Sequence, residues 1–160
     1  MNDVSDWLQA YQRSHLNPVN RVVNWICVPQ SVFAIWLGLK CIPIGNDALN
    51  VATVAAVGAW LYYLKLSRPL ALGMLAVLAV LYTGVLAVED ISGAYAPWLA
   101  LAIFAEAWTS QLIGRHVEGE RSPLLKDLWF LLIGPLWLLA DVYRWLNWPL
   151  LSAGNKPTTA

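Results

Sequence analysis

Two short polar clusters in this chain carry residue types that can do chemistry. The first enters an apolar stretch, and its members recur about one helical turn apart: Tyr11, His15, Asn17, Asn20 and Asn24. A histidine in such a cluster can ligate a metal or act as a general acid or base. Helix capping and hydrogen bonding between helices explain the same side chains without chemistry, and both interpretations stay open.

The second cluster lies in and after a later apolar stretch. Glu106 and Gln111 are inside that stretch, and Arg115, His116 and Glu118 follow at its end. A carboxylate inside a membrane helix is costly, so Glu106 is predicted to be functional or paired. Glu118 and His116 are close enough along the chain to share one site, and a solvated charged loop is the alternative.

A third polar feature interrupts the last apolar stretch. Gly134 and Pro135 predict a helix kink there, and Asp141 follows about two turns later. Arg144 is three residues beyond Asp141, a spacing that places the two charges on one helix face. Asp141 is therefore a candidate acid and also a candidate ion-pair partner of Arg144.

The chain around these clusters has the composition of a membrane protein. Of its 160 residues 59% are hydrophobic and 12% charged, against roughly a quarter charged in soluble domains. Ten Trp and six Tyr suit the bilayer interface. The net charge is zero, which argues against nucleic acid as a partner. Cys27 and Cys41 are expected to be buried thiols without a disulfide, and the N-terminus does not have the pattern of a cleavable signal peptide.

Five apolar runs each approach the roughly 20 residues that a helix needs to cross a bilayer. They cover 22–39, 49–64, 70–88, 97–114 and 128–151. Open strand edges are excluded from lipid, so we predict an all-α integral membrane bundle of four to five transmembrane helices. The count stays open because the second run is short and the fifth is polar in its middle. Residues 1–151 are expected to form this one domain, and 152–160 a flexible tail.

The start of the first run carries its own helix signals. Asn17 is a typical helix cap and Pro18 suits the first helical position. A short amphipathic helix on the membrane surface is predicted just before this start.

Orientation follows from the basic residues that flank the runs. They precede the first run and lie in the second and fourth loops: Arg13, Arg21, Lys65, Arg68, Arg115, Arg121 and Lys126. The positive-inside rule then predicts that the N-terminus lies on the cytoplasmic side of the membrane, which is a bacterial inner membrane or the endoplasmic reticulum membrane. His15 and His116 belong to the same face, so one site can include both.

The two clusters together resemble the membrane family of 2-hydroxy fatty acid dioxygenases, from about Trp7 to Leu146. The first family signature is similar to Tyr-x-x-x-His-x-Asn-Pro-x-Asn-x-x-x-His-x-x-x-x-Pro, matched here by Tyr11, His15, Asn17, Pro18, Asn20 and Pro29. The second is similar to Gln-Phe-Ile-Gly-His-x-x-Glu-Gly with later Pro, Lys-Asp-Leu and Gly-Pro, matched by Gln111, Gly114, Glu118, Gly119, Pro123, Lys126, Asp127, Leu128, Gly134 and Pro135.

This resemblance implies an iron(II) enzyme that uses molecular oxygen to shorten 2-hydroxy fatty acids by one carbon, as in alpha-oxidation. The acyl chain of such a substrate can lie in the bilayer while its polar head reaches the cytoplasmic face. Non-haem iron needs histidine and carboxylate ligands with positions left open for substrate and oxygen.

Two histidines of the family pattern are missing. Asn24 stands at the second histidine of the first signature, and Arg115 stands at the histidine after Gly114. A guanidinium cannot ligate iron because it offers no lone pair. His116 is the next residue and points about 100° away on a helix.

Three hypotheses follow from these departures. Fe(II) is held by His15, His116 and Glu118; or the site is a metal-free acid/base isomerase or cyclase for an acyl or isoprenoid substrate; or the protein binds lipid without catalysis. In the second, Glu118, Glu106 or Asp141 is the acid and His15 the base, with Asn24 at the site. In the third, Arg115 holds an anionic head group. Residues expected to position a substrate are Tyr11, Asn17, Asn20 and Gln111. The oligomeric state stays open.

Overall fold

The computed structural model describes residues 17–46, 49–118 and 124–148, and every structural statement below concerns these residues. They form α2 (Pro18–Lys40), α3 (Val51–Leu66), α4 (Arg68–Ser92), α5 (Ala96–Glu118) and α6 (Leu124–Trp145), with a 3-10 turn η1 (Gly93–Tyr95). The all-α prediction is confirmed. The predicted N-terminal amphipathic helix and C-terminal tail lie outside the described residues.

Polar side chains cap the first three of these helices. The Asn17 side chain accepts the N–H of Val19 at 2.9 Å, and Pro18 opens α2, as predicted. Asn50 accepts the N–H of Thr53 at 3.0 Å at the start of α3. Ser67 caps α4. Since each cap satisfies a backbone donor that has no partner inside the helix, these three helices begin within about one turn of the predicted apolar runs. α5 also follows its predicted run to within about one turn.

The last helix covers a different range from the predicted run 128–151. α6 begins at Leu124, runs through Pro135 and ends at Trp145. Beyond it, Asn147 has a φ of 55°, and the Trp148 N–H donates to the Tyr143 carbonyl at 2.8 Å. Asparagine tolerates this left-handed conformation, which ends a helix even where the sequence stays apolar. The predicted end was therefore wrong.

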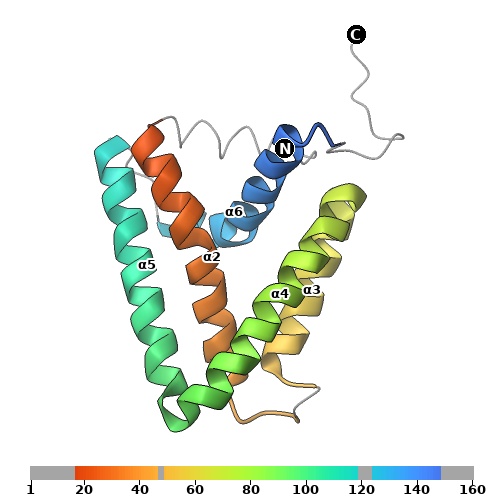
Figure 1. Cartoon of the computed structure of the whole chain (residues 1–160), viewed down its shortest axis with the longest axis vertical. Coiled ribbons are helices and arrows are strands. Elements are labelled where there is room, and N and C mark those ends of the chain that lie inside the picture. The colour runs from red at the N-terminus through yellow and green to blue at the C-terminus, as the bar shows by residue number, and fades with distance from the viewer. Residues whose placement is uncertain (1–16, 47–48, 119–123, 149–160) are drawn as a thin grey trace.

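The helices form two antiparallel pairs that diverge toward one end of the molecule, with α6 between them (Figure 1). α2 lies beside α5, and α3 lies beside α4. The start of α2 and the ends of α5 and α6 lie at the same end, which is at the top in Figure 1. We name it the upper end. Both sequence clusters, in so far as they are described, contribute residues there.

Apolar side chains fill the bundle and also cover its outside. Fully buried ones from α2, α4 and α6 include Leu37, Leu70, Met74, Val85 and Leu136. Outward-facing ones that are more than half exposed include Val22, Ile26, Leu72, Val80 and Leu101. Two helical stretches, Pro18–Lys40 and Arg68–His116, are long and apolar enough to cross a membrane, and Val51–Leu66 is apolar but shorter. An apolar exterior of this kind is typical of a surface that faces lipid.

Candidate functional site

α2 and α5 meet along a seam of small and polar side chains. The buried members are Asn20, Asn24, Cys27, Ser31 and Ala34 in α2, and Ala100, Ala107 and Gly114 in α5. They recur mostly every three or four residues in α2 and every seven in α5, so they line one face of each helix. Small residues on such a face let two helix backbones approach closely.

Gly114 marks a point of very close approach. A Cβ built on Gly114 would lie 2.6 Å from Asn20 Oδ1 and 3.4 Å from a methyl of Val23. The first distance is shorter than any ordinary contact, so a larger residue at this position would displace the Asn20 side chain or the helix. Asn20 belongs to the first sequence cluster and Gly114 to the second. The structure therefore brings the two clusters together.

The Gln111 side chain links α5 to α2 by hydrogen bonds. Its Nε2 donates to Ser31 Oγ at 2.8 Å and to the Cys27 carbonyl at 3.3 Å. The Ser31 hydroxyl in turn donates to the Cys27 carbonyl at 2.8 Å. Ser31 was not singled out from the sequence, because its role depends on a partner 80 residues away.

Asn20 and Asn24 lie on one buried face of α2, as their spacing predicted. Their exposed fractions are 0% and 3%. The Nδ2 of Asn24 donates to the Asn20 carbonyl at 2.8 Å and to Asn20 Oδ1 at 2.9 Å. The amide that stands in place of a family histidine is therefore turned along its own helix, toward the upper end.

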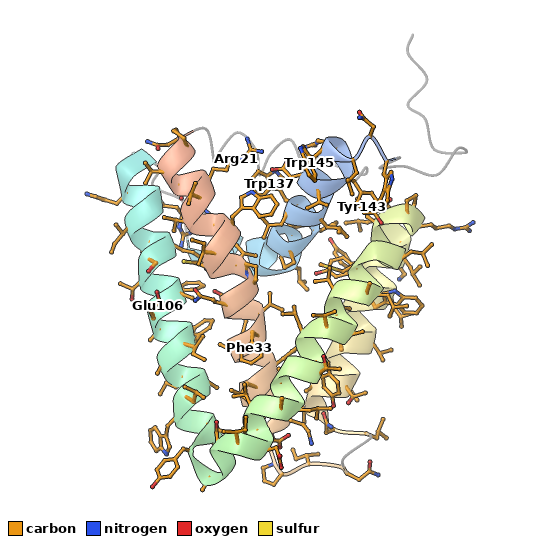
Figure 2. All side chains as sticks on the ribbon, in the orientation of Figure 1. Arg21, Phe33, Glu106, Trp137, Tyr143 and Trp145 are labelled. Atoms are coloured by element: carbon orange, nitrogen blue, oxygen red, sulfur yellow. The ribbon has the colours of Figure 1, made fainter. Side chains whose placement is uncertain are left out.

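Asp141 accepts hydrogen bonds from two arginines. The predicted partner, Arg144, donates to Asp141 Oδ1 at 3.2 Å, and this pairing is confirmed. Arg21 of α2 donates to Asp141 Oδ2 at 2.6 Å, and its guanidinium carbon lies 5.6 Å from the centre of the Trp137 ring (Figure 2). Two cations share one carboxylate whose side chain is 9% exposed.

The Arg21 partner was missed from the sequence, although one signal for it exists. A carboxylate inside an apolar helix requires a cation or a proton. Arg144 met that requirement by spacing alone, whereas Arg21 is 120 residues away from Asp141. The consequence is that α6 is tied to α2 at the upper end.

Arg115, His116 and Glu106 lie on less buried parts of α5. The Arg115 guanidinium carbon is 5.9 Å from the centre of the Trp108 ring, about two turns earlier in the same helix. His116 is exposed. Glu106 is also exposed, midway along α5, and accepts the Ser110 hydroxyl at 3.3 Å (Figure 2). Glu106 is therefore separated along α5 from the upper-end residues.

The remaining predicted site residues are Tyr11, His15, Asn17 and Glu118. Tyr11 and His15 lie outside the described residues. The backbone of Glu118 ends α5, while its side chain lies outside the described part. Asn17 is described, and its side chain caps α2.

The two altered family positions do not suit iron(II). The Asn24 amide nitrogen donates to two acceptors of its own helix, and Arg115 presents a permanent cation. Within residues 17–46, 49–118 and 124–148, no three side chains of His, Cys, Asp or Glu come together as a metal site would need.

Comparison with known proteins gives one match. The chain fits the family model described as 2-hydroxy-palmitic acid dioxygenase Mpo1-like over residues 1–146. No curated protein and no solved structure matches it. The matched range includes both sequence clusters and every described helix. The chain therefore belongs to the 2-hydroxy-palmitic acid dioxygenase Mpo1-like family.

Proposed function

We propose that this chain is a membrane-embedded enzyme that acts on a 2-hydroxy fatty acid, or a closely related acyl substrate, at the upper end of the bundle. The observation that supports this most is the approach of Gly114 to Asn20. It joins the two segments that resemble the family signatures, within a chain that matches the family almost throughout. The site is then built by the start of α2, the end of α5 and the end of α6.

In this proposal α2, α3, α4 and α5 cross the bilayer, and α6 completes the upper end. α3 has 16 residues, about 24 Å at about 1.5 Å per residue, so it fits a locally thin or tilted region. Basic residues gather at the upper end from all five helices: Arg21, Lys65, Arg68, Arg115 and Arg144. This bias supports a cytoplasmic upper end.

The same cations suit a substrate with a carboxylate head. Arg21 and Arg144 share the single charge of Asp141, which leaves one positive charge in excess at that point. Guanidinium groups bind carboxylates through paired N–H donors. We expect the substrate head to lie near Arg21 and Arg144 and its tail to run down among the helices.

Oxygen-dependent shortening by one carbon is the reaction that family membership supports. The side chains left for Fe(II) are His15, His116 and Glu118, a set of two imidazoles and one carboxylate. Such a set leaves positions open for substrate and oxygen, which is the chemistry the metal would supply. The chain's own contribution would be to hold the head group and to keep water from the tail.

Acid/base isomerisation or cyclisation of an acyl or isoprenoid substrate is the second candidate. The specific observation that favours it is the pair Asn24 and Arg115 at two family histidine positions. His15 is the proposed base here, and Glu118 the proposed acid. A lipid-binding protein without catalysis, with Arg115 holding the head group, is the third outcome of the test below.

The test uses purified full-length protein in lipid nanodiscs, loaded anaerobically with Fe(II) and then exposed to oxygen. With 2-hydroxypalmitate, mass spectrometry should find a product one carbon shorter, and Glu118→Gln should abolish it. Asp90→Asn, an equal loss of charge on an exposed residue at the opposite end, is the matched control and should keep full activity. A product with all carbons retained would favour the second candidate. Bound lipid that no condition converts, and whose retention needs Arg115, would favour the third.

A further inference from the structure

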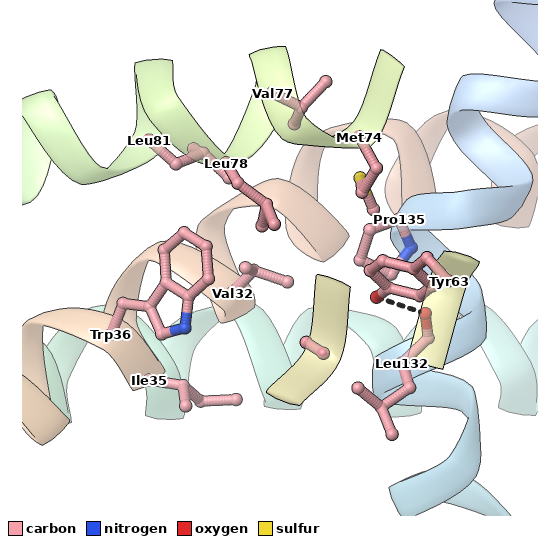
Figure 3. A pocket seen from close by; sticks show the side chains of 11 residues that line it. Val32, Ile35, Trp36, Tyr63, Met74, Val77, Leu78, Leu81, Leu132 and Pro135 are labelled. Atoms are coloured by element: carbon pink, nitrogen blue, oxygen red, sulfur yellow. Dashed lines mark hydrogen bonds between the residues drawn. The ribbon is translucent and has the colours of Figure 1, made fainter. Parts of the chain in front are cut away.

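A partly open apolar cavity of about 120 Å³ lies between α2, α3, α4 and α6 (Figure 3). It lies on a different face of α2 from the seam with α5. Residues that line it include Val32, Trp36, Ala59, Tyr63, Met74 and Leu78. Met74 is 1% exposed and Trp36 is 5% exposed, so the walls are part of the folded core.

The lining selects for hydrocarbon. The Tyr63 hydroxyl donates to the Leu132 carbonyl at 2.8 Å, so this polar group of the wall already has a partner (Figure 3). The remaining walls are aliphatic or aromatic. An engineered apolar cavity of about 150 Å³ stays dry and accepts an apolar ring, so a space of this size suits a few methylene groups better than water.

The cavity runs along the bundle and begins close to the upper end. Tyr63, Met74 and Pro135 lie at one end of the cavity, on the right in Figure 3, and Trp36 and Leu81 lie at the other end, on the left. The first end is nearer the upper end of the bundle, because α4 begins there and Met74 precedes Leu81 in it. Pro135 belongs to α6, and Asp141 follows in the same helix after about 9 Å at about 1.5 Å per residue. One helix thus borders both the cationic head-group region and the apolar cavity.

We propose that this cavity receives the end of the acyl tail and selects substrates by chain length. The class of substrate in this inference rests on the proposed function. The position of the end of its tail rests on the cavity. Ala59 lines the cavity from α3, one helical turn before Tyr63, and a larger side chain there would reduce the space for the tail. Leu78 of α4 lines the wall, and removing most of its side chain would lengthen that space.

The experiment measures binding of a series of 2-hydroxy fatty acids of increasing chain length to the full-length protein in nanodiscs, without metal or oxygen. Ala59→Phe should weaken the longer members about tenfold, the loss expected for about two buried methylenes, and leave the shorter members unchanged. Gly58→Phe is the matched control, because Gly58 is exposed and a Cβ built on it meets nothing within 4 Å. It should bind the whole series as the wild type does.

Leu78→Ala provides the opposite change, in case Ala59→Phe does not fold. It should move the preference toward longer chains. Helical circular dichroism and a single peak in gel filtration establish that each variant is folded. The proposal is overturned if each of the two variants that folds, Ala59→Phe or Leu78→Ala, binds the fatty acid series with the same chain-length preference as the wild type.

Trp36 supplies a direct reporter of the tail. Fatty acids brominated near the tail end should quench indole fluorescence, and Trp36→Phe should remove part of that quenching. Equal quenching in both proteins would place the tail elsewhere and overturn the proposal. If the chain-length preference shifts in the variants but the wild type shows no turnover, the cavity is the tail site and the proposed enzyme function is wrong. If the wild type turns over substrate but the preference does not shift, only the proposed role of the cavity is wrong.

Discussion

The carboxamide of Gln111 in α5 donates to the hydroxyl of Ser31 in α2 across 2.8 Å. It also reaches the Cys27 carbonyl at 3.3 Å, so a single side chain holds two groups of the facing helix. Apolar attraction between helices is weak in lipid, where polar contacts and close packing of small residues hold helices together. In α5, Gln111 supplies a polar contact of this kind and Gly114 allows the close packing.

Gly114→Ala is expected to destabilise the bundle. The added methyl would lie 2.6 Å from Asn20 Oδ1, so the buried Asn20 side chain must shift or α2 and α5 must separate. Overpacking of this kind costs about 1–3 kcal/mol. Thermal unfolding in detergent measures the loss, and Gly58→Ala, which meets no atom within 4 Å, is the control. Equal melting temperatures for the two variants would show that the close approach is not rigid.

The Gln111–Ser31 hydrogen bond is predicted to carry a measurable coupling energy. A double-mutant cycle with Gln111→Leu and Ser31→Ala should give about 0.6–1.7 kcal/mol, the range found for hydrogen bonds between helices in membranes. Thr109→Val serves as the comparison, because the exposed Thr109 hydroxyl donates to the Ala105 carbonyl of its own helix. A coupling indistinguishable from zero would mean that packing alone joins α2 to α5.

Arg21→Met should lower stability more than Arg144→Met does. Both arginines bond to Asp141, but Arg21 links α2 to α6, whereas Arg144 lies in the same helix as Asp141. Pairs three residues apart in one helix contribute only about 0.2–0.5 kcal/mol. Denaturation of the two variants side by side gives the comparison. The reverse order would show that α6 is held by other contacts.

Restoring the two missing histidines should increase iron binding. Asn24→His and Arg115→His together place imidazoles at the two positions where the family pattern has them, and remove the cation that repels Fe(II). We expect the double variant to retain more iron per chain than the wild type after anaerobic loading and desalting, measured by elemental analysis. Asn24→Leu with Arg115→Leu, which removes the same groups without adding ligands, is the control. Iron at the wild-type level in the histidine variant would show that these positions do not face a common site.

Cys41 should report the topology through its reaction with a membrane-impermeant maleimide. It follows the last residue of α2, at the end opposite Arg21. Burial, and then the nearby Glu89 carboxylate, raise the pKa of its thiol. The thiolate is the reactive form, so labelling should be slow at neutral pH. As long as the pH stays below that pKa, the labelling rate should increase about tenfold for each unit by which the pH is raised.

The expected labelling is from the side of the membrane opposite the one that exposes Arg21. Cys27 is buried and should stay unlabelled. A Cys27→Ser variant, which leaves Cys41 as the one cysteine, should label at the same rate. Labelling from both sides of sealed vesicles would contradict the proposed crossing of α2.

Local signals in the sequence were enough for the helices and for part of the site. The cap at Asn17, the shared face of Asn20 and Asn24, and the Asp141–Arg144 pair each depend on residues within four positions. Periodicity and capping report such contacts directly. The end of α6 was not predictable in this way, because apolar residues continue past the left-handed Asn147.

Contacts between helices that are distant in the sequence could not be predicted from it, for a different reason. Arg21–Asp141 and Gln111–Ser31 require the order in which the helices are packed, which spacing along one helix does not contain. The family resemblance did indicate that the two clusters share a site, and the approach of Gly114 to Asn20 agrees with it. It could not indicate the cavity beside Trp36, which depends on side chains from four helices.

The seam between α2 and α5 also has a consequence for biogenesis. α2 is made first and carries Asn20, Asn24 and Ser31 on one face, while Gln111 is synthesised 80 residues after Ser31. In the proposed membrane orientation, α2 must wait at the insertion machinery, or be shielded by it, until α5 arrives. A chain truncated before α5 should therefore be recognised by membrane quality control, although its remaining helices are apolar enough to insert.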